Sequence, residues 1–176
     1  MALKPKFSII TITYNAASVI KPTLESVVAQ TYTNYEYILV DGGSKDDTVA
    51  IAKASGIDFA HIISERDKGI YDAMNKGIDN ANGDYLVFLN AGDKFHADNT
   101  LAEIATGLSS VHGNELDEET WPAVLYGETD IVDDNGEFLR HRRLQAPEVL
   151  TWRSFLNGML VCHQSFYVRA DIARQF

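Results

Sequence analysis

Residues Ser64–Asp93 read SERDKGIYDAMNKGIDNANGDYLVFLNAGD, and this stretch decides the fold. Its first half predicts a helix, because apolar residues recur there at spacings of three and four. These residues are Ile70, Ala73, Met74, Ile78 and Ala81. Gly83 is expected to end the helix in a left-handed conformation. The unbroken apolar run Tyr85–Leu89 then predicts a strand covered on both faces, as in a parallel sheet.

The same alternation of strand and helix fills the chain before this stretch. Strands are predicted at Phe7–Tyr14, Tyr35–Val40 and His61–Ser64, and helices at Val19–Gln30 and from Thr48 to about Ala54. Strands that alternate with helices in this way form a parallel sheet with right-handed crossovers. The sequence therefore predicts an α/β fold, with a mostly parallel sheet flanked by helices.

The second half of the chain has a different pattern. A helix is predicted at Thr100–Leu108, strands at Val124–Val132, Glu137–Leu144 and Leu160–Val168, a partly helical segment at Pro147–Leu156, and a further helix from Ala170 to Phe176. Asn135-Gly136 between two strand-like runs is a strong hairpin signal. We expect one domain over residues 1–176, with the active crevice built mainly by residues 1–98 and a smaller hairpin-containing part at residues 99–176.

Length and composition limit the function classes. The chain has 176 residues, which suits a single domain with a sizeable core. Its net charge of −10 argues against a nucleic-acid partner. Cys162 is the one cysteine, so no intrachain disulfide forms. The sequence has no apolar run long enough to span a bilayer and no signal-peptide core at its start, which predicts a cytoplasmic protein.

Polar side chains follow each strand of the predicted sheet. The loops Tyr14–Ser18, Asp41–Asp47 and Asn90–Asp93 all come after strands, and Asp67 joins them after the third strand. Because open α/β sheets bind ligands in the crevice at the carboxyl ends of their strands, these groups are expected to converge on one site.

Each acidic side chain there has two interpretations on chemistry alone. Asp41 either accepts a hydrogen bond from a ligand, such as the imide of a nucleobase, or stabilises its own turn. Asp93 either binds a divalent cation, which prefers oxygen ligands, or serves as a turn carboxylate.

The remaining candidates are equally open. Tyr14 either stacks on a flat base or packs at a strand end. Lys68 either meets a phosphate near a helix N-terminus or is solvated. His163 and Gln164 follow an apolar stretch, where a histidine is more often structural than catalytic. The basic run Arg140–Arg143 is either a solvated edge strand or a contact for a phosphorylated acceptor.

Several motifs together resemble one family. They are Thr13-Tyr14-Asn15, Asp41-Gly42-Gly43-Ser44-Lys45-Asp46-Asp47-Thr48, Asp67-Lys68-Gly69-Ile70-Tyr71-Asp72-Ala73-Met74-Asn75-Lys76-Gly77, Asn90-Ala91-Gly92-Asp93 and His163-Gln164. Over nearly the whole chain the sequence resembles the family 2 glycosyltransferases of the GT-A fold. It looks most like the bacterial branch that builds O-antigen and other surface polysaccharides.

The resemblance implies an inverting sugar transfer from a nucleoside-diphosphate sugar, with UDP favoured, to a saccharide or lipid-linked acceptor. It assigns Thr13, Tyr14, Asn15, Asp41, Asp67 and Lys68 to the donor site, with Tyr14 against the base and Asp41 on its edge. It assigns Mn²⁺ or Mg²⁺ to Asp93, and His163 and Gln164 to the acceptor side. A lipid-linked acceptor would bring the protein into peripheral contact with the inner face of the plasma membrane.

The chain departs from the family pattern at three places. Asn90 and Gly92 stand where the family's metal motif has further carboxylates, and Met74 stands where many relatives carry an arginine near the phosphates, a role that Lys68 or Lys76 could fill. The family's catalytic aspartate lies beyond Phe176, so we assign no catalytic base and expect a C-terminally truncated chain. A non-catalytic nucleotide-sugar-binding module is therefore the alternative. A nucleotidyltransferase is disfavoured, because Asn15-Ala16-Ala17-Ser18 is not a glycine-rich basic loop.

Overall fold

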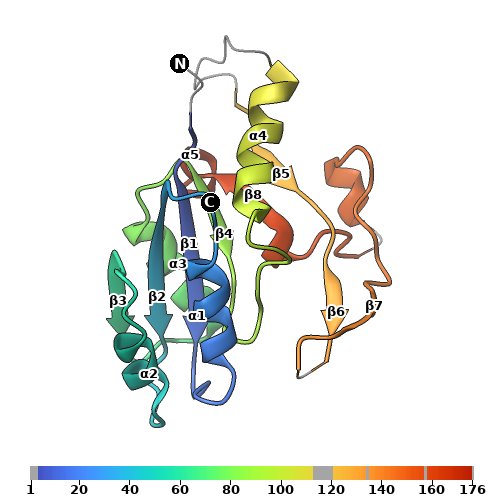
Figure 1. Cartoon of the computed structure of the whole chain (residues 1–176). Coiled ribbons are helices and arrows are strands. Elements are labelled where there is room, and N and C mark those ends of the chain that lie inside the picture. Colours follow the sequence, from blue (N-terminus) through green and yellow to red (C-terminus); the bar gives the residue numbers. More distant parts are fainter. Residues whose placement is uncertain (1–3, 113–120, 134, 157, 176) are drawn as a thin grey trace.

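The structure, a computed structural model, describes residues 4–112, 121–133, 135–156 and 158–175. Its centre is a six-stranded sheet in the order β3-β2-β1-β4-β8-β5 (Figure 1). The strands are β1 Phe7–Thr13, β2 Tyr35–Asp41, β3 His61–Ser64, β4 Tyr85–Phe88, β5 Val124–Tyr126 and β8 Phe166–Arg169. The first four run parallel, whereas β8 runs antiparallel to both β4 and β5. The predicted α/β fold with a mostly parallel sheet is confirmed.

Helices cover both faces of this sheet. They are α1 Ile20–Val28, α2 Thr48–Ala54, α3 Ile70–Asn80, α4 Thr100–His112 and α5 Ala170–Ala173. Side chains of α1, α2 and α4 share one buried apolar cluster with one face of the sheet, and α3 and α5 share a second cluster with the other face. Because each fully buried aliphatic or aromatic side chain contributes about 1.5–3 kcal/mol, these two layers hold the strand ends in fixed positions.

Two glycines let the chain approach the sheet closely. A Cβ on Gly77 of α3 would lie 2.5 Å from Ile10 Cγ2, so only glycine fits where this helix crosses β1. The prediction that Gly83 ends α3 in a left-handed conformation is wrong, because the helix ends at Asn80 and Ala81 is already extended. Gly83 instead donates its N–H to Ser8 Oγ at 2.8 Å, and a Cβ there would lie 2.6 Å from the same oxygen. Close approach, rather than a helix cap, requires this glycine.

The second half of the chain differs from the prediction in its details. The strand expected at Val124–Val132 is two strands, since β5 joins the main sheet and β6 Asp130–Val132 pairs with β7 Phe138–His141. That pairing confirms the predicted hairpin, in which Gly136 has a φ of 84°; Asp134 lies outside the described residues. The segment Pro147–Leu156 contains only the 3₁₀ turn η3 Trp152–Phe155. A second 3₁₀ turn, η4 His163–Ser165, leads directly into β8.

Among the described residues, no helix has the length and apolar character required to cross a membrane.

Candidate functional site

The loops after β1 and β2 are joined by hydrogen bonds at the carboxyl end of the sheet. The N–H of Asn15 donates to Ser44 Oγ at 2.8 Å, and the N–H of Lys45 donates to Asn15 Oδ1 at 2.8 Å. Asn15 has a φ of 48°, a left-handed conformation that asparagine tolerates better than most residues. The N–H of Ala17 also donates to Asp46 Oδ2 at 3.0 Å. Asn15, which the sequence assigns to the donor site, therefore links the two loops through hydrogen bonds.

Asp41 ends β2 and is fully buried. Its Oδ2 accepts hydrogen bonds from the N–H groups of Gly43 at 3.2 Å and Ser44 at 3.0 Å, and from Ser64 Oγ at 2.7 Å. The Ser44 hydroxyl donates to its other oxygen, Oδ1. These contacts describe an aspartate that stabilises its own turn and ties that turn to β3. The reading of a base edge by Asp41 stays a prediction.

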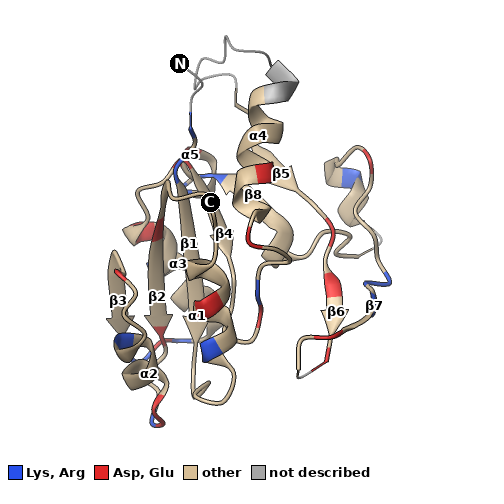
Figure 2. Ribbon diagram, in the orientation of Figure 1, with Lys and Arg blue, Asp and Glu red and all other residues tan. Residues whose placement is uncertain are grey.

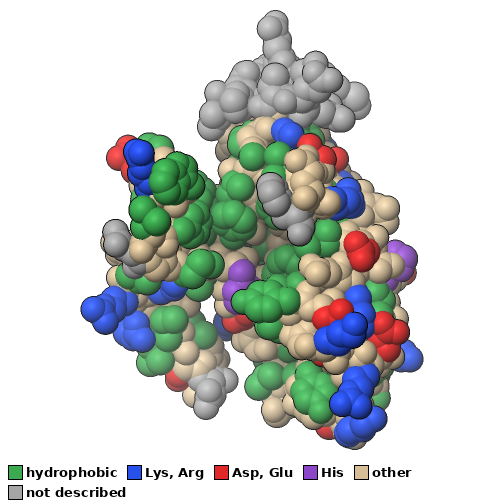
Figure 3. All heavy atoms as spheres, turned by 180° about the vertical axis from the view of Figure 1, so that it is seen from behind, with side chains coloured by type: hydrophobic (Ala, Val, Ile, Leu, Met, Phe, Trp, Pro, Cys, Tyr) green, Lys and Arg blue, Asp and Glu red, His purple; other side chains and the backbone are tan. Residues whose placement is uncertain are grey.

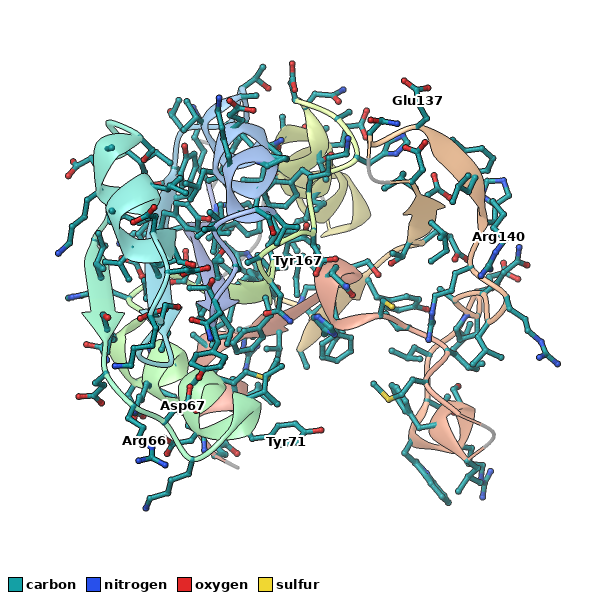
Figure 4. All side chains as sticks on the ribbon, turned by 90° about the horizontal axis from the view of Figure 1, so that it is seen from below. Arg66, Asp67, Tyr71, Glu137, Arg140 and Tyr167 are labelled. Atoms are coloured by element: carbon teal, nitrogen blue, oxygen red, sulfur yellow. The ribbon has the colours of Figure 1, made fainter. Side chains whose placement is uncertain are left out.

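Tyr14 and Asp67 come together over Gly42. An ideal Cβ on this buried glycine would lie 2.5 Å from Asp67 Oδ2 and 3.4 Å from Tyr14 Cδ2. The Tyr14 side chain is 62% exposed, and Asp67 accepts the N–H of Gly69 at 2.9 Å through Oδ1. Viewed toward the carboxyl ends of the strands, Asp67 lies beside the start of α3 (Figure 4). An exposed ring beside a half-buried carboxylate can bind a flat base and a hydroxyl.

The lysines predicted near the phosphates lie on α3 and the loop before it. Lys68 is exposed, and its N–H donates to Asp72 Oδ2 at 3.1 Å. Lys76 pairs with Glu65 at 2.8 Å and with Asp72 at 3.4 Å, and these bonds raise the pKa of its ammonium. Met74 packs in the apolar cluster on the α3 face of the sheet. Two carboxylates therefore engage Lys76, which leaves Lys68 as the better candidate for a phosphate.

Asp93 and the His163-Gln164 pair are brought into direct contact, although 70 or more residues separate them in the sequence. Gln164 Nε2 donates to Asp93 Oδ2 at 3.0 Å. Asn90 Nδ2 lies 3.0 Å from His163 Nε2. Burial raises the pKa of the Asp93 carboxyl, and burial lowers the pKa of His163 even though Asp93 lies near. A neutral His163 that accepts a hydrogen bond from the Asn90 amide fits both observations.

This cluster has polar atoms that lack a partner. Asn90 Oδ1 and Gln164 Oε1 are buried and accept no hydrogen bond in the described structure, and the same holds for Thr13 Oγ1. A buried acceptor without a donor is costly, so such atoms indicate a place where a ligand, water or cation binds. The sequence places the loop Asn90–Asp93 at this site but assigns no role to the Asn90 side chain, which stands where the family motif has a carboxylate.

A divalent cation fits these oxygen atoms, because hard cations accept carboxylate and amide oxygens alike. The described residues hold no cluster of three or more His, Cys, Asp or Glu side chains arranged for a metal. Such a cation would be held by one carboxylate, neutral amide oxygens and the phosphates of a ligand. Mg²⁺ commonly binds in this way, with one or two protein carboxylates.

The basic run Arg140–Arg143 is only partly on a strand. Arg140 and His141 belong to β7, and Arg142 and Arg143 follow it. Arg140 lies on the outer side of the hairpin, away from Asp67 (Figure 4). The surface is hollowed between this outer part and the main sheet (Figure 3). The position of Arg140 favours a solvated strand over contact with a ligand in the crevice.

The structure resembles solved glycosyltransferases of the GT-A fold. TarS from S. aureus, solved with UDP-GlcNAc, matches 97% of this chain and 47% of its own with a TM-score of 0.71 at 22% identity. The mannosyltransferase PcManGT from Pyrobaculum calidifontis, solved with GDP-Man and Mn²⁺, matches 57% of this chain and 31% of its own with a TM-score of 0.53 at 28% identity. The chain therefore has the GT-A fold of these glycosyltransferases.

Sequence comparison gives the family. The profile of glycosyl transferase family 2 matches residues 8–112, and the chain belongs to this family. A PGL/p-HBAD biosynthesis glycosyltransferase of Mycobacterium tuberculosis is 34% identical over 175 residues, which are 96% of this chain and 60% of that protein. An uncharacterized glycosyltransferase of the same species is 36% identical over 177 residues, which are 99% of this chain and 63% of that protein. The chain thus spans about 60% of the length of the relatives it matches.

Proposed function

We propose that this domain binds a nucleoside-diphosphate sugar in the crevice at the carboxyl ends of β1 to β4 and transfers the sugar to an acceptor hydroxyl with inversion. One observation carries this proposal. Among the described residues, two buried acceptor oxygens near Asp93 have no hydrogen-bond partner, namely Asn90 Oδ1 and Gln164 Oε1. They lie at the same end of the sheet as Tyr14 and Asp67. Family membership supports the reaction class.

The donor's nucleoside is proposed to lie against Tyr14, with Asp67 accepting a hydrogen bond from it. Thr13, Asn15 and Asp41 are proposed to belong to the same donor site, and Lys68 is proposed to approach the diphosphate near the start of α3. The complexes of TarS with UDP-GlcNAc and of PcManGT with GDP-Man support a sugar nucleotide, and UDP is our first candidate. A hexose is the sugar that we expect.

Mn²⁺ or Mg²⁺ is proposed to bind Asp93, with Asn90 and Gln164 supplying amide oxygens. When bound, such a cation stabilises the negative charge that develops on the leaving diphosphate. The Gln164 amide N–H holds the Asp93 carboxylate in place while its own oxygen stays available. PcManGT was solved with Mn²⁺, which supports this assignment.

In the proposed reaction the acceptor oxygen bonds to the anomeric carbon from the face opposite the diphosphate, and the bond to the diphosphate breaks. A base must remove the proton of the acceptor hydroxyl. We assign no residue of this chain to that role. His163 and Gln164 are proposed to face the acceptor, which is a saccharide or a lipid-linked saccharide of a bacterial surface polysaccharide such as O-antigen, at the cytoplasmic face of the membrane. Nucleotide-sugar binding without transfer is the alternative.

Calorimetric titration of UDP, with and without Mn²⁺, tests the donor site. We expect metal-dependent binding that Asp93→Ala abolishes. Metal-independent binding would retain the nucleotide pocket and remove the role given to Asp93. Absence of binding to UDP, GDP and dTDP under both conditions would refute the donor site. A transfer assay with the intact chain then separates the enzyme from the binding module, because only the enzyme releases free nucleoside diphosphate in the presence of acceptor.

A further inference from the structure

Exposed apolar side chains gather on one part of the molecule, residues 138–160, which we call the outer lobe. It comprises β7, the 3₁₀ turn η3 and the connections around them (Figure 1). Seven of the thirteen large apolar side chains that are exposed among the described residues belong to it. They are Phe138, Leu139, Val149, Trp152, Phe155, Leu156 and Met159. Isolated exposed apolar residues are normal, but a group of this kind marks an interaction surface.

The outer lobe also has a charge opposite to that of the rest of the chain. It carries four arginines and one glutamate, a net charge of +3, whereas the remaining residues carry 11 basic and 24 acidic side chains, a net charge of −13. Figure 2 shows basic residues at β7 and at η3, with acidic residues distributed over the other elements. A partner of this surface is therefore expected to be both apolar and anionic.

The arginines of the outer lobe have two different roles. Arg142 is structural, since its guanidinium donates to the carbonyl oxygens of Leu160 at 3.0 Å and Leu144 at 3.3 Å. Arg140 and Arg143 are exposed. Arg153 stacks over the ring of Trp152, with its guanidinium carbon 5.0 Å from the ring centre. Arg142 thus ties the strand side of the outer lobe to its end at Leu160. The other three arginines carry their charge at the surface of the lobe.

We propose that the outer lobe docks on the surface of an anionic lipid bilayer. Tryptophan and arginine side by side suit the membrane interface, where the indole sits at headgroup level and the guanidinium stays hydrated. Leu156 and Met159, 70% and 58% exposed, supply the apolar contact. The acidic body does not prevent docking, because charges more than about 8 Å from the lipid are screened at physiological ionic strength.

Lipid fits these observations better than a folded protein does. The apolar residues are spread over a hairpin strand, a 3₁₀ turn and the connections around them. Interfaces between proteins depend on a few anchor residues in fitted pockets, whereas a bilayer accepts an irregular apolar surface with basic residues around it. The proposal does not depend on the donor site.

Trp152 reports on this docking directly. The protein has two tryptophans, of which Trp121 is buried with 6% of its surface exposed and Trp152 is 70% exposed. With Trp121→Phe, Trp152 is the sole indole; should this variant fail to fold, the difference between wild type and Trp152→Phe gives the same signal. Vesicles of phosphatidylcholine, alone or mixed with phosphatidylglycerol, are titrated in. We expect the fluorescence emission of Trp152 to shift to the blue, and to be quenched by brominated acyl chains, with the mixed vesicles alone.

Paired variants distinguish binding through the outer lobe from a general effect of the protein's charge. Arg140→Gln with Arg143→Gln is expected to weaken partitioning to the mixed vesicles roughly thirtyfold, since each basic residue near the lipid contributes about a fivefold factor. Lys21→Gln with Lys53→Gln removes the same charge from α1 and α2 and should leave partitioning unchanged. Leu156→Ser should weaken it roughly tenfold, and Val28→Ser, a matched exposed residue of α1, should not.

Several results would overturn the proposal. The first is no binding to the mixed vesicles, and the second is equal binding to both kinds of vesicle. The third is an equal loss of partitioning to the mixed vesicles in the double arginine variant and the double lysine variant. A concentration-dependent blue shift of Trp152 without lipid, together with a dimer in sedimentation velocity, would instead assign the outer lobe to an interface between copies. UDP binding measured in the same variants keeps this outcome separate from the donor site.

Discussion

Replacing Gly42 with alanine would displace the Asp67 side chain of the proposed donor site and place a methyl group against the Tyr14 ring, while leaving both side chains in the chain. Gly42 does not have a positive φ, so alanine fits the backbone. The new Cβ, however, would lie 2.5 Å from Asp67 Oδ2, where a carbon and an oxygen need about 3.3 Å. The carboxylate must therefore retreat by about 0.8 Å. The Cβ would also touch the Tyr14 ring at 3.4 Å.

The expected loss in nucleotide binding follows from that displacement. A hydrogen bond to a charged group contributes about 1.5–3 kcal/mol, which corresponds to a factor of roughly 10 to 100 in Kd. Folding should change little, because the obstacle is the end of a flexible side chain. The lower entropy of the unfolded alanine chain contributes about 0.4–1 kcal/mol of stability, and the Gly69 N–H bonds to Asp67 Oδ1 rather than to Oδ2, the oxygen that the new Cβ meets.

Calorimetric titration of UDP into Gly42→Ala and the wild-type protein measures this loss, and urea denaturation measures the change in stability. Gly127→Ala is the matched control, since a Cβ there has no neighbour within 4 Å. Asp67→Asn removes the charge of this side chain without displacing it, so it distinguishes the effect of a displaced Asp67 side chain on UDP binding from the effect of a lost charge. If Gly42→Ala binds UDP as tightly as the wild-type protein does, Asp67 does not accept a hydrogen bond from the nucleotide, and its place in the proposed donor site is wrong.

Three further predictions concern packing and charge. Gly77→Ala should lower the free energy of unfolding by about 1–3 kcal/mol because its Cβ meets Ile10, and urea denaturation measures this loss. Asp93→Asn should make the ligand-free protein more stable at neutral pH. The pKa of Asp93 is raised in the folded state, so the unfolded chain releases its proton first and stability falls as pH rises through that range; thermal unfolding of both proteins against pH should show the difference disappear in acid. The lowered pKa of His163 has the opposite effect, because below about pH 6.5 the unfolded chain takes up a proton that the folded chain does not; His163→Gln should show a smaller loss of stability on acidification than the wild-type protein.

The first four strands and three helices could be predicted from the sequence because their signals are local. Apolar periodicity located α3 and the unbroken run located β4, each within a few residues of its observed bounds. The role of Gly83 could not be found in this way. The need for a glycine at this position comes from Ser8 on a neighbouring strand, and nothing near Gly83 in the sequence indicates that contact. The division of Val124–Val132 into two strands likewise depends on which partner each half meets.

The candidate site shows the same limit. Tyr14, Asp41, Asp67 and Asp93 could be placed at one end of the sheet, since each follows a strand of a parallel sheet. The hydrogen bond from Ser64 to Asp41 could not be predicted, because Ser64 reaches Asp41 only through the pairing of β2 and β3. The contact between Gln164 and Asp93 requires β8 to enter the sheet next to β4 in the antiparallel sense, which the sequence of neither segment specifies.

That antiparallel strand explains how a site with one carboxylate can still be suited to a cation. β8 places η4 at the carboxyl end of β4, so Gln164 reaches Asp93 and His163 reaches Asn90 from the other half of the chain. The carboxylate is then fixed by a neutral donor rather than by a cationic side chain, which would compete with a metal for its charge. Asn90 and Gln164 keep their oxygens unpaired. Asn90 in place of a motif carboxylate therefore lowers the negative charge of the site but keeps an oxygen, whereas Gly92 supplies no side-chain oxygen. A cation bound there would depend on the diphosphate of the donor for most of its charge neutralisation.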